Sequence, residues 1–502
     1  MSQDRHNFLR HAAIYFAARG LPGVIAFLAI PLYSRLLAPE GYGKFALVLA
    51  CSNLISALFF QGLLHALVRF TPAYASDPTR LKSTLLAATL SLIAAAGAVG
   101  GVLCILPPTR HLWPVVTACW LLLAVLQPFE LFSEYARARL RPWNYMVLQL
   151  AKSAGTVVFG GILIKLGAGW MGALLGSVAA GVAPLIYSYR RDWAGIPLRI
   201  DREVMRIVFA YSAPLSATVA LAVVIASSDR FIIAGMMGES AAGLYAVSAD
   251  LTARTLTLLM MVVYTAMFPL AVRAWEEGGP EAARERMRDN AAVLLAVGLP
   301  AAAGLAMLSG SIADCFLGQS YRAAAAGVIP LIAVAGLLAG LKSCHWDAAF
   351  QFTNRTIHQV WIVLVVSLIN IALNVLFIPH LGINGAAVAS ITAYCVSIVI
   401  TAAVGRRHFA LPFPLRPAAQ VFVAVACMAA ALYPLRAYRG GLVVSVQVLT
   451  GVSVYAAALL ALNFLHLRDV LLNKLAATRR SAQEDSISLS DAIVAPELEA
   501  AP

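Results

Sequence analysis

The chain has 502 residues, of which 61% are hydrophobic and only 12% charged, and its formal net charge is +13 at pH 7. An ordinary soluble protein carries about a quarter of charged residues, so this composition excludes one. Long apolar stretches occupy the chain almost from end to end. Because the bilayer core offers no water to the backbone, each such stretch must form a helix. We therefore predict an all-α polytopic membrane protein.

About 14 of these stretches are long enough to cross a bilayer. An even number of crossings puts both termini on the same side. The connections are short, and none outside the membrane could form a folded domain. In chain order, the predicted transmembrane helices are residues 11–35, 45–68, 82–106, 113–135, 144–165, 170–189, 207–234, 242–270, 290–310, 325–349, 358–379, 384–404, 417–435 and 442–465.

Lys and Arg are distributed unequally between the two sides that this topology defines. We count Lys and Arg residues at the ends of a helix with the adjoining connection. On this count, 25 of the 37 Lys and Arg residues lie on the side of the termini and 7 lie on the other side. Cytoplasmic loops carry the excess of positive charge, so we expect both termini in the cytoplasm. The net charge then reflects topology and contact with anionic lipids rather than binding of nucleic acid.

Two pairs of short segments resemble each other at an offset of about 200 residues. The first match aligns Gly43 with Gly243. Such repeats are typical of transporters, whose substrate path lies between the halves; chance similarity between helices rich in Gly and Ala is the alternative. The matching segments are 36–46 (LLAPEGYGKFA) with 236–246 (MMGESAAGLYA), and 166–177 (LGAGWMGALLGS) with 381–390 (LGINGAAVAS).

Duplication of a six-helix unit predicts two pseudo-symmetric lobes. The N-lobe would comprise residues 1–206 and the C-lobe residues 207–410. Helices 13 and 14, in residues 411–467, would be an addition. Residues 468–502 are predicted to form a disordered cytoplasmic tail, because the end of the chain is acidic and lacks apolar runs.

Several ionisable residues lie deep in the predicted helices of the second half, where a charge is costly and usually faces a partner or a cavity. Asp250 and Arg254 are four residues apart on one helix, so we expect them to pair. Lys342 and Asp347 are five apart and need not meet. Asp229, Asp250 and Asp347 are candidates for binding a coupling ion, and structural pairing is the alternative. Arg230 is adjacent to Asp229 and needs a partner elsewhere.

The first half differs because its deep charges, Arg19 and Lys152, have no deep acid in their own six helices. Two such cations indicate a site for an anion. Arg69 and His65, four residues apart near the cytoplasmic end of helix 2, could extend that site at its mouth. The alternatives are that Arg19 and Lys152 reach the membrane surface and that His65 is a packed or surface residue.

Signatures of catalysis and of metal binding are missing from the sequence. The nine His residues have no metal-binding spacing, and no phosphate-binding loop of the form G-x-x-x-x-G-K-[ST] occurs. We therefore expect no cofactor, no resident metal and no hydrolysis of ATP. A transporter rather than an enzyme is predicted.

Three segments of the chain resemble bacterial polysaccharide exporters of the O-antigen flippase type, which belong to the multidrug/oligosaccharidyl-lipid/polysaccharide (MOP) superfamily. The third segment is the most specific. The segments are residues 10–50 (RHAAIYFAARGLPGVIAFLAIPLYSRLLAPEGYGKFALVLA), 227–251 (SSDRFIIAGMMGESAAGLYAVSADL) and 370–394 (NIALNVLFIPHLGINGAAVASITAY).

The resemblance implies two lobes in a V around a cation-lined cavity. It implies movement of undecaprenyl-diphosphate-linked oligosaccharide from the cytoplasmic to the periplasmic leaflet of the bacterial inner membrane by alternating access, for O-antigen, capsule or exopolysaccharide. The lipid tail would pass between helices 1 and 8. Candidate pyrophosphate ligands are Arg19, Lys152, Arg69, His65 and Arg254, and candidate sugar contacts are Asn53, Gln61, Gln127, Gln149 and Tyr145, with Ser153, Tyr15 and Trp361 as further contacts.

The resemblance also implies partners and leaves other functions open. The lipid-linked substrate and membrane lipid are expected partners, with a glycan polymerase and a chain-length regulator, and Na+ or H+ would be the coupling ion. A cation-coupled multidrug antiporter of the same superfamily is one alternative, although such proteins favour deep acids in the cavity. A membrane glycan polymerase or ligase is the other, although the outer loops here are short.

Overall fold

The computed structural model describes residues 20–106, 112–353 and 355–469, and in these ranges it contains helices and no β-strand. Eleven helices are long and apolar enough to cross a membrane, and a shorter apolar helix, Gly20–Leu36, precedes them. Two of the eleven, Pro142–Trp193 and Glu239–Met307, each contain two predicted crossings. The predicted all-α polytopic membrane protein is therefore confirmed. Arg19, Tyr15 and most of the predicted tail lie outside the described residues.

The helices follow one another through short connections. Five-residue π-helical turns occur in several of them, including η6 (Lys342–Trp346). The α-helices after Gly20–Leu36 are α2 (Pro39–Ile55), α3 (Gln61–Phe70), α4 (Pro78–Ile105), α5 (Trp113–Ala138), α6 (Pro142–Leu163), α7 (Gly169–Ser188), α8 (Arg202–Met237), α9 (Glu239–Met307), α10 (Ser309–Phe316), α11 (Arg322–Leu341), α12 (Ala348–Phe352), α13 (Thr356–Leu381), α14 (Ile383–Gly405), α15 (Leu415–Leu432) and α16 (Gly441–Ala461).

The two segments of the second sequence match both turn at a glycine with positive φ. Gly167, between α6 and α7, has φ +92°, and Gly382, between α13 and α14, has φ +60°. Both follow a Leu at the same place in the match. Because a side chain is strained in this left-handed region, glycine allows each helix to reverse direction there. The shared turn gives the sequence match a physical basis.

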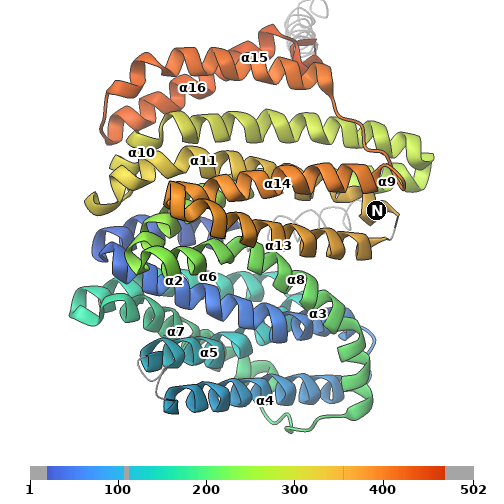
Figure 1. The fold of residues 1–502 in the computed structure, drawn as a ribbon. Helices are drawn as coiled ribbons and strands as arrows, with labels where there is room; N and C mark the ends of the chain where they lie inside the picture. Colours follow the sequence, from blue (N-terminus) through green and yellow to red (C-terminus); the bar gives the residue numbers. More distant parts are fainter. Residues whose placement is uncertain (1–19, 107–111, 354, 470–502) are drawn as a thin grey trace, which may run out of the picture.

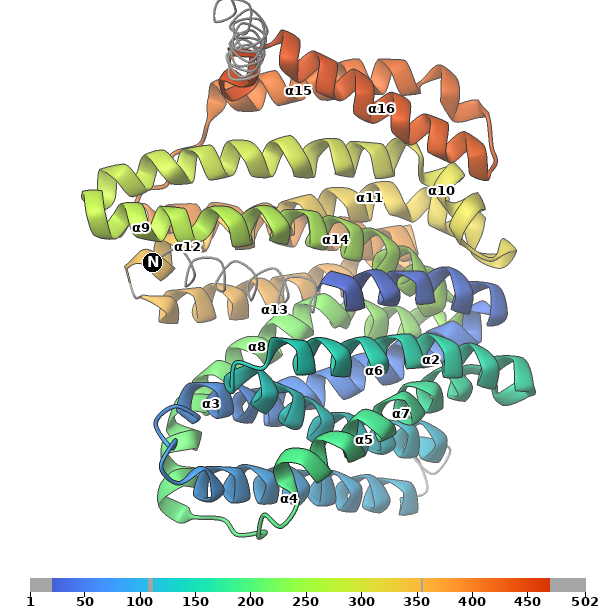
Figure 2. The same ribbon diagram turned by 180° about the vertical axis from the view of Figure 1, so that it is seen from behind.

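The helices gather in two groups with a pair of helices on the outside (Figures 1 and 2). Helices α2 to α7 form the lower group in Figure 1, and α9, α11, α13 and α14 lie in the upper group, with α8 running between the groups. Helices α15 and α16 pack on the outer side of the second half of α9, where Ala292, Val421 and Leu459 share one core cluster. The candidate site lies where the two groups meet.

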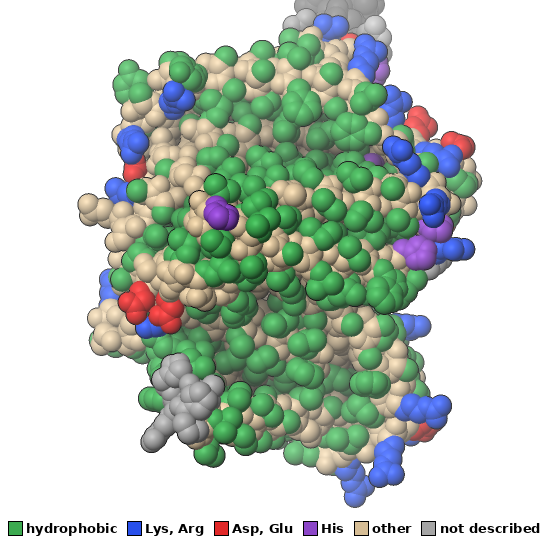
Figure 3. Space-filling view, in the orientation of Figure 1, with side chains coloured by type: hydrophobic (Ala, Val, Ile, Leu, Met, Phe, Trp, Pro, Cys, Tyr) green, Lys and Arg blue, Asp and Glu red, His purple; other side chains and the backbone are tan. Residues whose placement is uncertain are grey.

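The surface is divided into an apolar band and charged edges, as expected of a membrane protein. Hydrophobic side chains cover the broad middle of the face in Figure 3, and charged side chains gather at its two edges. Exposed apolar residues such as Leu442 (86% exposed) and Val399 (67% exposed) would be costly in water. In a bilayer, they face hydrocarbon.

Candidate functional site

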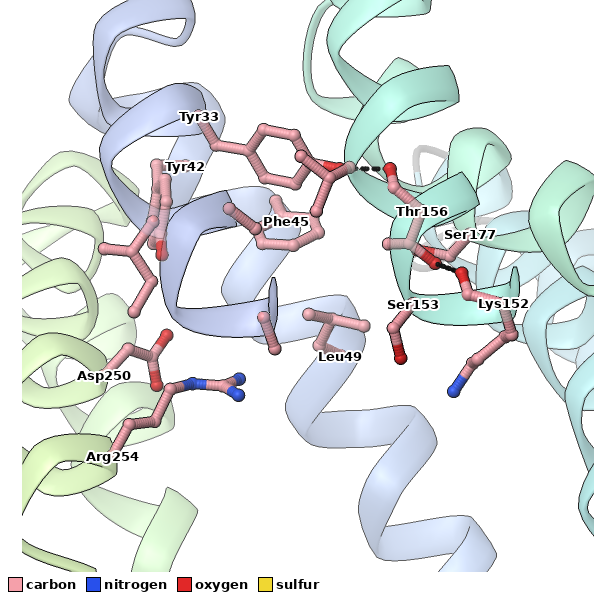
Figure 4. A pocket seen from close by; sticks show the side chains of 14 residues that line it. Tyr33, Tyr42, Phe45, Leu49, Lys152, Ser153, Thr156, Ser177, Asp250 and Arg254 are labelled. Carbon is pink, nitrogen blue, oxygen red and sulfur yellow. Dashed lines mark hydrogen bonds between the residues drawn. The ribbon is translucent and has the colours of Figure 1, made fainter. Parts of the chain in front are cut away.

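A cavity of about 160 Å³ lies between helix Gly20–Leu36, α2, α6, α7 and α9. It is bounded by elements of both helix groups. Figure 4 shows the cavity, with α9 on one side and α6 on the other. Its lining is Ala26, Ala29, Ile30, Tyr33, Tyr42, Phe45, Leu49, Lys152, Ser153, Thr156, Val157, Ser177, Asp250 and Arg254.

Lys152 enters the cavity from α6, and it is not the unpaired cation that we expected from the sequence. Its Nζ lies 3.5 Å from Oε1 of Glu130 on α5, and its side chain is 25% exposed. Helices α5 and α6 are joined by a short turn near residue 140, so Glu130 and Lys152 lie at similar depths on antiparallel neighbours. Gln149 also donates to Glu130, at 3.3 Å. Glu130 is not a deep acid by sequence position, because it lies only eight residues before the end of α5 at Ala138.

Asp250 does not pair with Arg254, as the spacing of four had predicted. Its Oδ1 accepts a hydrogen bond of 2.6 Å from Nη2 of Arg230 on α8. Asp250 therefore pairs with Arg230 on the neighbouring helix, and the side chains of Arg230 and Asp250 are only 16% and 21% exposed. Arg254 is left exposed in the cavity, with no ion pair to any described residue.

The cavity region therefore has an excess of positive charge among the described residues. Lys152 is balanced by Glu130 and Arg230 by Asp250, whereas Arg254 has no acidic partner. Figure 4 shows the charged ends of Arg254 and Lys152 extending toward each other from opposite walls. Such an arrangement suits an anion that can bridge the two helix groups.

Hydroxyl groups complete the lining near Lys152. Thr156 lies one turn beyond Lys152 on α6, and its hydroxyl donates to the Lys152 carbonyl at 2.9 Å. The Tyr33 hydroxyl donates to the Thr156 carbonyl at 2.7 Å. Ser153 was predicted from the sequence, whereas Tyr33, Thr156 and Ser177 were not. A helical spacing of four from Lys152 could have found Thr156.

Most of the other predicted substrate contacts do not line this cavity. His65 and Arg69 are exposed on α3, where His65 Nδ1 lies 2.7 Å from the Gln61 carbonyl oxygen. Gln127 is buried and accepts a hydrogen bond from Ser56 at 3.2 Å. The remaining described sugar candidates lie outside the lining as well, namely Asn53, Gln61, Gln149, Tyr145 and Trp361. Their roles stay predictions.

Asp229 is the deep acid without a cationic partner among the described residues. It is 5% exposed on α8. Its Oδ2 accepts hydrogen bonds from the hydroxyls of Tyr245 on α9 at 2.7 Å and Ser390 on α14 at 3.1 Å, and its Oδ1 accepts one from Nδ2 of Asn374 on α13 at 2.7 Å. Oδ1 of Asn374 is buried with no hydrogen-bond partner. Three neighbouring helices thus bring two hydroxyl donors and one amide N–H donor to one buried carboxylate.

Asp347 pairs with Lys342, which the spacing of five had not required. The two side chains meet at 2.9 Å, and Gln359 also donates to Asp347 at 2.9 Å. The cause is the π-helical turn η6, where the Asp347 N–H bonds the Lys342 carbonyl at 3.0 Å. A π-turn places residues five apart above each other, so this acid is neutralised.

Glycines close one end of the boundary between the helix groups. A Cβ atom at Gly43 on α2 would overlap the carbonyl oxygen of Glu239, and one at Gly243 on α9 would overlap that of Pro39. These are the two glycines that the sequence match aligned. Their backbones approach so closely that no side chain fits between them. The loops at this end are the ones with few Lys and Arg residues, so we expect this end to face outward.

Aromatic and polar contacts strengthen this closed end. Tyr42 on α2 and Tyr321 before α11 are 2% and 1% exposed, with ring centroids 6.1 Å apart. The Tyr321 hydroxyl donates to the Leu37 carbonyl at 2.9 Å. Nζ of Lys44 lies 3.3 Å from Oε2 of Glu239. The two groups are therefore joined by packing at one end and bound a charged cavity farther in.

The sequence matches a known family over most of its first two thirds. Residues 32–326 match the family described as "Polysaccharide biosynthesis protein", a match that spans more than half of the chain. The matched region includes α2, α6, α7 and the first part of α9, which supply most of the cavity. A search of curated proteins finds no match.

Solved structures share the fold at low sequence identity. The lipid II flippase MurJ in an inward closed conformation matches with a TM-score of 0.73 and 12% identity, over 91% of this chain and 100% of that chain. A multidrug resistance MATE family transporter of the MOP superfamily matches in its inward-facing conformation with a TM-score of 0.58 and 15% identity, over 79% of this chain and 98% of that chain. Its outward-facing conformation matches with a TM-score of 0.54 and 15% identity, over 80% and 95%. These likenesses establish the fold.

Proposed function

The chain belongs to the polysaccharide biosynthesis protein family, and on that premise we propose that it is a flippase for lipid-linked oligosaccharides. Its substrate would be an oligosaccharide carried on undecaprenyl diphosphate, moved from the cytoplasmic to the periplasmic leaflet of a bacterial inner membrane. The product would supply a glycan polymerase that makes O-antigen, capsule or exopolysaccharide. Both termini would lie in the cytoplasm.

The observation that carries this proposal is the unbalanced guanidinium of Arg254 opposite Lys152 in one cavity. A diphosphate offers several anionic oxygens, and guanidinium binds such groups through a planar fork. Arg254 lies on α9 and Lys152 on α6, so one diphosphate held by both would link the two helix groups. Hydroxyls of Ser153, Thr156 and Ser177 lie beside Lys152 and could hydrogen-bond the first sugar.

The same geometry suggests how the site could open toward the other leaflet. The glycine contact between α2 and α9 closes the end that we expect to face outward. If the helix groups rock apart at that contact, the diphosphate becomes accessible from outside. The substrate shifts this equilibrium only by the difference between its affinities for the two states. A ligand that bridges α6 and α9 can make such a difference.

Translocation by the purified chain in proteoliposomes tests the proposal. The chain would be reconstituted with undecaprenyl-diphosphate oligosaccharide on one leaflet, and appearance on the other leaflet would be followed by enzymatic access to the glycan. Wild-type protein should accelerate the movement. Arg254→Gln should slow it by about 10- to 100-fold, as expected for loss of hydrogen bonds to a charged group, and Arg254→Lys should recover part of the rate.

Arg199→Gln is the matched control because Arg199 is exposed in the loop before α8, away from the cavity. It should transport at the wild-type rate. Equal rates in wild-type and Arg254→Gln proteoliposomes, both above protein-free vesicles, would show that the cavity cation does not handle the substrate. Rates no higher than those of protein-free vesicles would overturn the flippase proposal itself.

A multidrug antiporter is the alternative that the MATE-like fold favours. The positive charge of the cavity argues against an antiporter. A cationic drug would be repelled by Arg254 and Lys152, and Asp250 is already paired with Arg230. Efflux of a cationic dye from cells separates the two. The flippase proposal predicts no dye efflux and accumulation of lipid-linked oligosaccharide when the gene is deleted. Dye efflux without that accumulation would establish the antiporter.

For the coupling ion, Asp229 is the best supported of the three candidate acids. Asp250 and Asp347 each have a cationic partner, whereas Asp229 is surrounded by hydroxyl and amide groups. Hard cations take oxygen ligands, and the Asp229 carboxylate with the hydroxyl oxygens of Tyr245 and Ser390 could supply them. We include binding of Na+ or H+ at Asp229 in the proposal.

Imposed ion gradients test this part separately. Transport in proteoliposomes should respond to a gradient of either Na+ or H+, and Asp229→Asn should abolish the response. Glu281→Gln, a change of an exposed carboxylate on the loop segment of α9, should leave it intact. A gradient response that survives Asp229→Asn would remove Asp229 from the coupling step without affecting the flippase proposal.

A further inference from the structure

A second and larger cavity lies far from the first along the chain, on the second half of the molecule. It has a volume of about 400 Å³ and runs along the last two turns of α14, beside α12 and the segment that leads to α15. None of the helices that bound the charged cavity contributes to it. Its lining is Trp346, Ala349, Ile398, Val399, Thr401, Ala402, Ala403, Gly405, Arg406, Phe409, Leu411 and Phe413.

The lining changes from apolar to cationic along α14. Ile398, Val399 and Ala402 form the apolar part, and Val399 is 67% exposed, so this groove opens to the outside of the helix bundle. Arg406 lies at the end of α14. The distance from residue 398 to residue 406 along a helix is about 12 Å. A molecule that fills the groove would therefore be apolar over most of its length and anionic at one end.

Two polar groups in the groove lack protein partners. The Thr401 side chain is 1% exposed, and its hydroxyl has no hydrogen-bond partner among the described residues. A buried hydroxyl left without a partner is costly. Arg406 is exposed and forms no ion pair within the described part of the chain. Thr401 offers a donor about one and a half turns deeper than Arg406.

Aromatic rings form the wall opposite α14. Trp346 and Phe413 are stacked, with ring centroids 6.1 Å apart and an angle of 16° between their planes. Phe409 is 2% exposed and packs against Phe352 of α12. No Asp or Glu is among the described residues that line the groove, and Arg407 adds a second exposed cation beside Arg406. The groove therefore offers cationic groups to a phosphate and no carboxylate to the ammonium group of a zwitterionic lipid.

We propose that this groove binds one anionic phospholipid from the leaflet at the α14–α15 connection. The phosphate binds Arg406, an ester carbonyl accepts the Thr401 hydroxyl, and one acyl chain lies along Ile398, Val399 and Ala402. Chain, ester and phosphate of a phospholipid follow one another in the same order as these apolar, hydroxyl and cationic groups. The bound lipid joins α14 to the aromatic segment and stabilises the folded chain by mass action.

Lipid titration of the purified full-length chain in a neutral detergent tests the proposal. Phosphatidylglycerol and phosphatidylcholine with the same acyl chains would be added, and binding would be measured by native mass spectrometry and by thermal unfolding. Phosphatidylglycerol should bind with defined stoichiometry and raise the unfolding temperature, and phosphatidylcholine should bind much more weakly. Arg406→Gln should weaken phosphatidylglycerol binding by about tenfold, and Arg406→Lys should retain most of it.

Three further variants locate the lipid. Thr401→Val keeps the side-chain volume and should weaken binding by about two- to tenfold. Ala402→Trp fills the groove and should abolish the specific binding. Arg190→Gln removes an exposed cation at the end of α7, outside the groove, and should bind like wild type.

Several outcomes would overturn the proposal. Equal binding of the two lipids, or equal loss in Arg406→Gln and Arg190→Gln, would mean ordinary contact with surrounding lipid. Undiminished binding in Ala402→Trp would place the lipid elsewhere. Displacement of phosphatidylglycerol by inorganic phosphate at similar concentration would show a site for small anions and not for a lipid.

Discussion

The two ends of the boundary between the helix groups are built in opposite ways. At the closed end, Gly43 and Gly243 bring the backbones of α2 and α9 into contact, and Tyr42 and Tyr321 pack beside them. Farther in, Lys152 and Arg254 face each other across a cavity with hydroxyl groups and unbalanced charge. Close packing of backbone and aromatic rings closes the first region, and charged side chains with room between them line the second.

This contrast predicts where substitutions that add volume and substitutions that change charge should act. Added volume at the closed end pushes the helix groups apart and changes which side is accessible. A changed charge in the cavity leaves the packing intact and changes what is bound. The two regions share α2 and α9, so the binding of an anion in one can alter the equilibrium of the other. Substitutions that change side-chain volume but not charge, and substitutions that change charge but not volume, therefore test the two regions separately.

The largest effect is expected at the closed end. In Gly43→Ala the new methyl group overlaps the Glu239 carbonyl oxygen, which belongs to backbone and cannot move aside cheaply. Helices α2 and α9 should separate, and transport should fall by at least about tenfold. Access would be measured with Leu37→Cys, introduced after replacement of the native cysteines, because Leu37 is buried in this region at 7% exposure. A membrane-impermeant maleimide should label it faster when Gly43 is replaced.

Gly235→Ala is the control for that experiment. A Cβ at Gly235 meets no atom within 4 Å, so neither labelling nor transport should change. If Gly43→Ala left both transport and labelling of Leu37→Cys as in the unmodified chain, the closed end would not be a moving contact.

An intermediate effect is expected from the ion pair in the cavity. Glu130→Gln releases Lys152, so an anionic head group should bind more tightly by about two- to fivefold, a modest gain because the pair is partly exposed to solvent. Lys152→Met should weaken binding. Affinity for undecaprenyl diphosphate measured by native mass spectrometry would check both. Weaker binding in Glu130→Gln would mean that the acid positions Lys152 and does not compete for it.

The smallest effect is expected from an ion pair outside both regions. Asp201 begins α8, and the Arg80 guanidinium donates to it at 2.6 Å. This bond, helped by the Val204 N–H, lowers the pKa of Asp201 below its ordinary value of 3.8. Its contribution to stability is therefore present above that value and is lost as pH falls through the lowered pKa.

Arg80→Gln should accordingly lower the unfolding temperature slightly at neutral pH. The difference from wild type should disappear below the lowered pKa, and transport at neutral pH should not change. Thermal unfolding measured from pH 7 to pH 3 checks this. A difference that grew as the pH fell would contradict the assigned pairing.

The sequence predicted the helices well because they depend on local features. Apolar length marks each crossing, and the tight turns at Gly167 and Gly382 require glycine whatever lies around them. The match aligned Gly43 with Gly243 as a duplication, and only the structure shows that the two glycines are also in contact.

Charge partners were predicted poorly because they depend on which helices are neighbours. Arg230 on α8 takes Asp250 away from Arg254, and Glu130 on α5 reaches Lys152. Neither pair has a characteristic spacing in sequence. The pairing of Lys342 with Asp347 depends on a π-turn that the sequence around these residues does not predict. The cavity hydroxyls of Tyr33 and Ser177 come from two further helices, so only the folded chain brings them together.

Binding of the lipid head group to Arg254 tests the central claim most directly. Native mass spectrometry would compare undecaprenyl diphosphate, undecaprenyl phosphate and undecaprenol on wild type, Arg254→Gln and Arg199→Gln. We predict that wild type and Arg199→Gln prefer the diphosphate, then the monophosphate, then the alcohol, and that Arg254→Gln loses most of this preference. An unchanged order and spacing of affinities in Arg254→Gln would contradict the account.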